Sequence, residues 1–360
     1  HLNLVKYIFE NGLKKAIKYK HIKIIKFLSK YICIPSDHLL FYICKKGNIE
    51  IIKLFIEKRV NNFNDLFIHA CEGGDFGIIN FLIEKGANNF QRGFTVACIH
   101  NKIEIMKFLF EKGIDDIQEG FYRACENGHF KIVKFLFKKG VEKNFEEEFI
   151  IASYNGHFDI VEFLFVRGAK NLEEAFKSAC QNGHFSVVKF LIEKGFNNFQ
   201  KGFDMACFDG HFEIVKFLIE KEFNNIEKAF NNACERGHLE IVKFLIKKGI
   251  NNFKIGFNKA CFGGHFEIVE LLIEEETVKI KSGFKNACRN DRIEIVKFLI
   301  DKKKVDDFQE VFNDACLNGS VKVVEFLIKE KGIKKFEGIR SNIEGYKRKE
   351  IILILDRYGL

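Results

Sequence analysis

Cysteine and histidine recur along the chain at a spacing that could bind a metal ion. Six histidines occupy equivalent places in successive segments, and five of them follow a Cys by four residues: His129, His157, His184, His211, His238 and His265. Thiolate and imidazole are both ligands of Zn²⁺. However, Ser153 replaces the Cys in one segment, and we place Asp75 and Asp291 at the His position of two others. A structural turn tolerates such changes, so we favour His residues that stabilise a tight turn by hydrogen bonds.

No catalytic constellation accompanies these histidines. His69 and His100 lie elsewhere and have no evident Asp or Ser partner motif. We find no phosphate loop, nucleophile elbow or paired carboxylate motif. The sequence therefore predicts a protein that is not an enzyme, with no catalytic residue, no cofactor and no metal.

The cysteines themselves follow a repeat. Nine of the eleven, from Cys71 to Cys316, occupy one position in different segments. Equivalent positions in stacked helical units lie roughly 10 Å apart, whereas a disulfide needs Cα atoms closer than about 7 Å. We therefore expect buried, reduced thiols and a cytoplasmic location, in a host cell if the chain is viral.

The repeat is written most clearly as Phe-x-x-Ala-Cys, which occurs ten times with one Ser in place of Cys. Its Phe residues are separated by 27 residues, except for two steps of 28: Phe67, Phe94, Phe121, Phe149, Phe176, Phe203, Phe230, Phe257, Phe284 and Phe312. A fixed period of this length indicates a solenoid, in which each unit buries its apolar face against its neighbours.

Each unit reads as two helices. In one unit the apolar spacing predicts helix A over about Phe199–Phe208, with Asn198 as its N-cap, and helix B over Phe212–Lys221. Gly ends several B helices, as Gly86 and Gly140 do. We divide the chain into a partial repeat at 1–12, two degenerate repeats at 13–60, ten regular repeats at 61–332 and a C-terminal capping repeat at 333–360.

Helix B resembles the second helix of the ankyrin repeat. The segments Gly183–Gly195 and Gly210–Glu222 are similar to that family's Gly-His-x-Glu-Val-Val-x-x-Leu-Leu pattern, and Gly86-Ala87 to its ending. The family period is 33 residues and includes a β-hairpin finger, so six residues are missing here. The resemblance implies an all-α, ankyrin-type helical-hairpin solenoid with a 27-residue period and reduced or absent fingers. It is similar to divergent ankyrin proteins of large DNA viruses and AT-rich protists.

Some positions of helix A vary while the rest repeat. They lie two residues after the Phe and one after the Cys, and in ankyrin relatives they face the concave groove that binds partners. Variation suggests exposure, although neutral drift with partial packing would also produce it. We predict a protein partner, held by large apolar groups at these positions: Ile99, Tyr154, Met205, Phe208, Phe262 and Leu317.

Helix B carries a stripe of lysines that could bind phosphate instead: Lys107, Lys134, Lys189, Lys216, Lys243 and Lys297. A Glu stands three residues before most of them, which favours solvated ion pairs. The net charge of +9 is spread over 58 basic and 49 acidic residues. A nucleic-acid-binding α-solenoid is thus the alternative to a protein-binding scaffold. No apolar stretch is long enough to predict a membrane span, and we expect a monomer.

Overall fold

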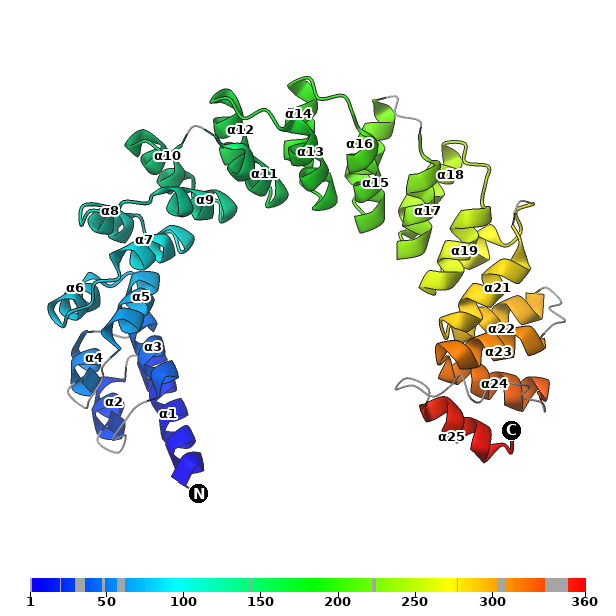
Figure 1. Ribbon diagram of the computed structural model, residues 1–360, viewed down its shortest axis with the longest axis horizontal. Helices are drawn as coiled ribbons and strands as arrows, with labels where there is room; N and C mark the ends of the chain where they lie inside the picture. Colours follow the sequence, from blue (N-terminus) through cyan, green and yellow to red (C-terminus); the bar gives the residue numbers. More distant parts are fainter. Residues whose placement is uncertain are drawn as a thin grey trace. The chain divides into compact units, whose positions relative to one another are not determined.

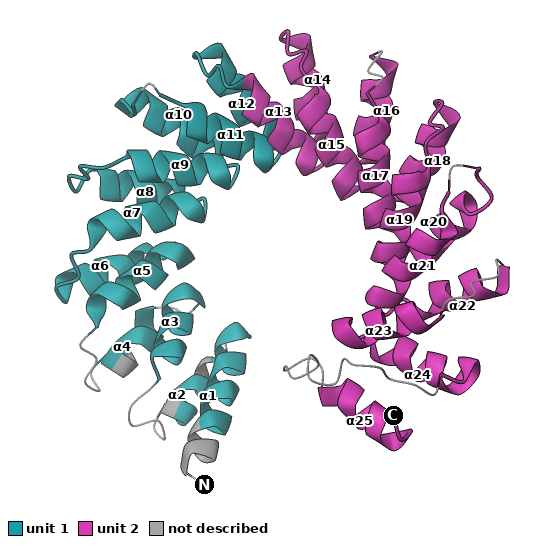
Figure 2. Ribbon diagram, turned by 45° about the vertical axis from the view of Figure 1, so that its right-hand side comes forward, with its two compact units in different colours: residues 1–171 teal, residues 172–360 magenta. Residues whose placement is uncertain are grey.

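The computed structural model describes residues 2–19, 21–29, 36–46, 49–56, 62–142, 144–221, 225–276, 278–302, 308–333 and 349–360. All regular structure in these residues is helical, and no strand occurs among them. The chain divides into two compact units, His1–Asn171 and Leu172–Leu360, coloured teal and magenta in Figure 2. None of the described helices is long and apolar enough to cross a membrane.

Unit 1 is built from consecutive helical hairpins. Its helices are α1 (Leu2–Lys18), α2 (Ile22–Ser29), α3 (Asp37–Lys46), α4 (Ile49–Ile56), α5 (Phe63–Gly73), α6 (Phe76–Glu84), α7 (Phe90–Ile99), α8 (Ile103–Phe110), α9 (Gln118–Glu126), α10 (Phe130–Lys139), α11 (Glu146–Tyr154) and α12 (Phe158–Val166). Odd-numbered helices correspond to helix A and even-numbered helices to helix B.

Unit 2 continues the same alternation from α13 to α24, and α25 follows residues that are not described. Its helices are α13 (Leu172–Gln181), α14 (Phe185–Glu193), α15 (Gln200–Asp209), α16 (Phe212–Glu220), α17 (Glu227–Arg236), α18 (Leu239–Lys247), α19 (Lys254–Gly263), α20 (Phe266–Leu272), α21 (Ile280–Arg289), α22 (Ile293–Lys302), α23 (Phe308–Asn318), α24 (Val321–Lys331) and α25 (Lys349–Arg357). The predicted all-α hairpin repeat without β-fingers is confirmed in the described residues.

Helices A form one layer of each unit and helices B the other. Neighbouring A helices, such as α17 and α19, pack along their length, whereas neighbouring B helices such as α18 and α20 touch much less. Each unit therefore bends with its A helices on the inner side, as Figure 1 shows within each part of the chain. We call the exposed side of the A layer the inner face.

The repeated Phe, Ala and Cys make up the core. Phe121, Ala124 and Cys125 of α9 are all fully buried, as are Leu136 and Val133 of α10. The same holds for the other regular repeats, with Ser153 buried in place of one Cys. Removing one such Phe side chain would cost about 3–5 kcal/mol, because a buried aromatic ring leaves a cavity.

The start of helix A differs in part from the expectation. Asn62 and Asn89, which stand five residues before the repeated Phe as Asn198 does, are N-caps, and their side chains accept from the backbone of Asp65 and Arg92. In α15 the cap is Phe199, one residue after Asn198. The same shift occurs in α9, α11, α17 and α19. In four of these five helices the first residue forms a hydrogen bond to the next repeat: Gln118, Glu146, Gln200 and Glu227.

Side chains at the start of helix A connect successive repeats where a finger would otherwise do so. The carboxylate of Glu146 accepts from the backbone of Lys170 and Asn171 at 2.8–3.2 Å. Asn64 accepts in the same way from Asn88 and Asn89. These bonds satisfy loop N–H groups that have no strand to pair with.

The N-terminal helix extends across the division drawn from sequence. Helix α1 runs from Leu2 to Lys18 without interruption at residue 12. Leu13, Ala16 and Ile17 occupy the Phe, Ala and Cys positions and are buried. Residues 2–12 therefore extend helix A of the first repeat, rather than form a separate partial repeat, since Gly12 alone does not end a helix.

Candidate protein-binding surface

The recurring histidines are held in hydrogen bonds between repeats. Nε2 of His129 lies 2.8 Å from the carbonyl oxygen of Ile99, and Nε2 of His238 lies 2.8 Å from that of Phe208. His157, His211 and His265 make the same bond to the last turn of the preceding helix A. A carbonyl can only accept, so Nε2 carries the proton and is not free to bind a metal ion. The structural interpretation is thus supported, with the bond reaching across to the preceding repeat.

The position assigned to Asp291 is wrong. Asp291 occupies the Gly position with φ 56°, and Arg292 takes the place of His. Nε of Arg292 donates to the carbonyl of Phe262 at 3.1 Å. Asn and Asp tolerate this left-handed conformation better than other residues with a side chain, which explains why Asp291 can replace Gly. Asp75 does occupy the His position, where it caps α6.

The Gly of each Gly-His pair has two reasons to remain Gly. Gly128 has φ 75°, and a Cβ there would lie 2.6 Å from the ring of His157 in the next repeat. The ring thus covers the turn of one repeat while its nitrogen binds the end of that repeat's helix A. This interlock fixes the C-terminal ends of the helices that carry the candidate residues.

All ten cysteines in the described residues are free and buried. Burial raises the pKa of Cys44, Cys71 and Cys316 to about 12. A thiol with such a pKa carries almost no thiolate near neutral pH. No group of three or more His, Cys, Asp or Glu side chains in the described part could hold a metal ion.

The variable positions of helix A line the inner face. Tyr154 and Phe262 are 43% and 46% exposed, although both are large and largely apolar. Ile99, Met205, Phe208 and Leu317 are half-buried. Phe208 lies under the guanidinium of Arg236, which is 4.3 Å from the ring centre. Among the variable positions, Ser178 is an exception because it is buried.

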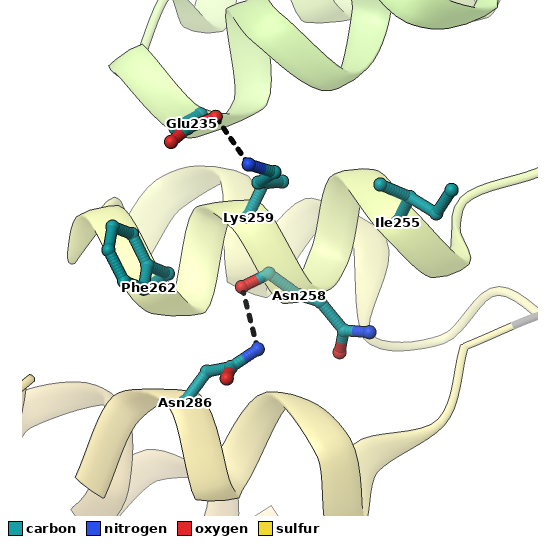
Figure 3. A pocket seen from close by; sticks show the side chains of 6 residues that line it. All are labelled: Glu235, Ile255, Asn258, Lys259, Phe262 and Asn286. Carbon is teal, nitrogen blue, oxygen red and sulfur yellow. Dashed lines mark hydrogen bonds and ion pairs between the residues drawn. The ribbon is translucent and has the colours of Figure 1, made fainter. Parts of the chain in front are cut away.

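One helix shows an apolar inner face most clearly. Ile255, Asn258, Lys259 and Phe262 follow one another at spacings of three, one and three, so they share one side of α19. Figure 3 shows them around a hollow of about 230 Å³ that Glu235 and Asn286 complete. Ile255 is 47% exposed. A pair of exposed apolar side chains therefore flanks a polar centre.

Ion pairs and hydrogen bonds hold this centre in place. Lys259 lies 2.8 Å from Glu235 of the preceding helix A, and Asn286 donates to the carbonyl of Asn258 at 3.4 Å. Oδ1 of Asn258 is buried and has no partner in the described residues. An unsatisfied acceptor at the edge of a hollow is a group that a bound donor could satisfy.

The lysines of helix B lie on the opposite layer, mostly exposed. Lys107 and Lys243 pair with Glu104 and Glu240, at 2.9 and 3.5 Å. Lys189 instead approaches Glu193 at 3.9 Å, and Lys134 lies over the ring of Phe130. The expected pairing with the Glu three residues earlier is therefore found at two of these lysines.

The sequence pattern did not predict the burial of two carboxylates. Glu148 is 3% exposed and Asp204 is 2% exposed. Asp204 pairs with Lys228 at 2.8 Å, whereas no cation in the described residues pairs with Glu148. A comparison of repeats would have found Glu148, because it directly precedes the repeated Phe, where the other regular repeats have Gly, Ala, Leu or Val.

Comparison with known proteins shows which family these helical hairpins belong to. A family model that describes ankyrin repeats in three copies matches residues 13–93, 67–147, 149–226, 203–282 and 257–337. The chain belongs to the ankyrin-repeat family. A search of curated proteins found no match. Among solved structures, the ankyrin repeat domain of human ASB11 is similar at 21% identity and a TM-score of 0.39, over 46% of this chain and 90% of that one.

Ankyrin repeats generally serve as scaffolds for protein interactions, and the fold is typically non-enzymatic. The match of the family model confirms the resemblance to ankyrin repeats that the helix B sequence shows. The shorter period is a property of this chain: in the described residues its repeats meet through side chains such as Glu146, and no strand connects them.

Proposed function

We propose that this chain is a non-enzymatic ankyrin scaffold that binds another protein through the inner face of its A helices. The observation that carries the proposal is the exposure of large apolar groups at the variable positions, most clearly Phe262 with Ile255 on α19. Buried aromatic anchors of this kind dominate the affinity of protein interfaces.

The composition of equivalent positions supports this interpretation. Other repeats place Glu126, Gln181 or Glu235 where Tyr154 and Phe262 stand. A polar residue therefore fits the fold there, and the core does not require an aromatic ring. An exposed ring leaves apolar surface in water, which a partner would remove at about 25 cal/mol per Å².

The rigid setting of these residues also favours recognition. His238 and Arg292 bind the carbonyls of Phe208 and Phe262 themselves, so the last turn of each helix is fixed from the next repeat. A preorganised anchor loses little conformational entropy on binding, which increases affinity. Tyr154 belongs to unit 1 and the other two rings to unit 2, so each unit would offer its own anchors.

Alanine substitution tests the proposal. The wild-type chain is used to capture proteins from cell extract, and the affinity of the most enriched protein is then measured. Tyr154→Ala, Phe208→Ala and Phe262→Ala should each weaken binding by about 2 kcal/mol, with little change in thermal unfolding.

Charge reversal on helix B provides the matched control. Lys189→Glu, Lys216→Glu and Lys243→Glu should leave the affinity nearly unchanged. If these changes abolish binding and the aromatic changes do not, the B layer is the binding surface. A strong salt dependence of binding to DNA or RNA would then favour a nucleic-acid partner.

The buried thiols fit a reducing compartment, and we place the chain in the cytoplasm on that basis. We also expect it to act as a monomer, which sedimentation analysis can check.

A further inference from the structure

A second hollow, of about 260 Å³, lies in unit 1 at the N-terminal ends of two successive A helices. Glu119 and Tyr122 of α9 form one side, and Glu147 and Glu148 of α11 form the other. Glu142 completes it from the loop that precedes α11. The hollow is smaller than the roughly 300–1,000 Å³ of pockets for drug-sized ligands, so it suits a single side chain.

Glu148 is the unusual member of this group. Its Oε1 accepts a hydrogen bond from Nε2 of Gln118 at 2.8 Å. Its Oε2 is closed to solvent and has no hydrogen-bond partner in the described residues. The side chain is 3% exposed and lines the hollow. A buried carboxylate oxygen without a donor destabilises the fold unless something else binds it.

The charge around the hollow is negative. Glu119 pairs with Arg123 at 2.8 Å, but Glu142, Glu147 and Glu148 form no ion pair within the described part of the chain. Lys143 lies outside the described residues. The N-termini of α9 and α11 each contribute roughly half a positive charge. The three carboxylates that have no ion pair among the described residues outweigh that charge, so these residues favour a cation in the hollow.

We propose that this hollow binds the guanidinium group of an arginine side chain presented by a partner protein. A guanidinium carries five N–H donors in one plane, which can reach separate carboxylates at once. Its flat face also stacks on an aromatic ring, and Tyr122 supplies one at the hollow, with the guanidinium of Arg123 over one side of that ring. A metal ion suits the site less well, because no metal-binding cluster of three such ligands occurs in the described residues.

The titration of the neighbouring groups agrees with this geometry. Burial raises the pKa of Glu148, and the charges of Glu147 and Glu142 raise it further. Burial and the nearby carboxylates, Glu126 first among them, raise the pKa of Tyr122. A bound cation would lower the pKa of both groups, because a nearby positive charge favours their ionised forms.

This inference rests on the proposed protein-binding function, since the arginine would come from the partner. It can nevertheless be tested without that partner. The probe is N-acetylarginine amide, titrated into the 360-residue chain labelled at isoleucine methyl groups for NMR. Ile117 precedes the lining residue Gln118, and Ile151 follows Glu148 by one helical turn, so both report on the hollow. Ile295 in unit 2 reports on non-specific effects.

We expect saturable shifts at Ile117 and Ile151 and none at Ile295. N-acetylcitrulline amide, which is similar in shape but neutral, should cause no shift. Glu148→Gln and Glu147→Gln should each weaken binding by about tenfold, as expected for the loss of a charge-assisted hydrogen bond. Glu162→Gln on α12 of the same repeat makes the same charge change away from the hollow and should leave binding unchanged.

The proposal is overturned if no saturable shift appears, if the citrulline probe binds equally well, or if Glu162→Gln has the same effect as Glu148→Gln. Thermal unfolding shows whether each variant is folded, and Glu147, which is exposed, gives a variant that leaves the core intact. If the arginine probe does not bind but Phe262→Ala still weakens binding of the partner protein, the arginine site is wrong and the proposed function is not contradicted.

Discussion

At the scale of single residues, hydrogen bonds between repeats explain the His position better than metal binding does. His129 and His238 donate to carbonyls of the preceding repeat, and Ser320 and Arg292 do so with a hydroxyl and a guanidinium. These side chains differ in almost every property except their ability to donate a hydrogen bond. Asp75 stands at the same position without donating, because its carboxylate caps α6. A structural turn tolerates such exchange, whereas a metal ligand set does not.

Glu148 gives a prediction at this scale. Because burial raises its pKa above the ordinary value of 4.5, the folded state holds a proton that the unfolded state has already lost. The stability of the wild-type chain should therefore fall as pH rises from about 4.5 through the raised pKa, and then level off. Glu148→Gln, which cannot ionise, should lack this decline.

Denaturant unfolding of both proteins from pH 4 to pH 8 measures the effect. The variant should be the more stable of the two at pH 8, with the difference shrinking toward pH 4. The groups that face Glu148 are Gln118, Glu142 and Glu147, so Glu162→Gln should reproduce the wild-type profile. Equal pH profiles for wild type and Glu148→Gln would show that Glu148 is not destabilised by burial.

At the scale of the helix, close packing between repeats overrides intrinsic helix propensity. Gly120 lies inside α9, where Gly is about 1 kcal/mol less favourable than Ala. A Cβ at this position would lie 2.5 Å from Cε1 of the buried Phe94 and 3.0 Å from Sγ of Cys98. Gly93, Gly202, Gly256 and Gly283 meet the preceding repeat in the same way.

Gly120→Ala should therefore destabilise the chain by about 1 kcal/mol, since overpacking of about 1–3 kcal/mol exceeds the gain in propensity. Ala229 occupies the same position in α17, where its Cβ is buried without conflict. Ala229→Gly should thus also destabilise, by about 1 kcal/mol. The midpoint of urea unfolding measures both changes, and a higher midpoint for Gly120→Ala would contradict the packing argument.

The sequence predicted the helices well because each core position recurs in ten repeats. Phe121, Ala124 and Leu136 have the same neighbours as their counterparts, so one pattern describes every repeat. The first residues of helix A were less predictable. Phe199 rather than Asn198 is the cap of α15, and the first residue of that helix, Gln200, accepts a hydrogen bond from Asn225 in a loop 25 residues away, which local spacing does not show.

The candidate surface was predictable only in part. Exposure of Tyr154 and Phe262 follows from their position in the repeat. The hollow beside Phe262 and the buried Glu148 depend on how neighbouring side chains meet, for which the period gives no information. Asp291, by contrast, could have been placed from the sequence, because it follows Cys288 by three residues, as Gly128 follows Cys125.

At the scale of the whole molecule, repetition fixes the core and leaves the inner face free to vary. Each repeat contacts only its neighbours, so stability is close to a sum of similar terms along the chain. A residue on the inner face can therefore change without consequence for distant repeats. That freedom permits a binding surface assembled from different side chains on equivalent helices, such as Tyr154, Phe208 and Phe262.

The central claim is that a protein partner lies against the A layer. The most direct measurement is photo-crosslinking in the presence of the captured protein, with p-benzoylphenylalanine placed at Phe262 on α19 or at Lys243 on α18. Both sites are exposed and lie in neighbouring repeats on opposite layers. The account predicts a crosslink to the partner from position 262 and none from position 243. A crosslink from position 243 alone would contradict it.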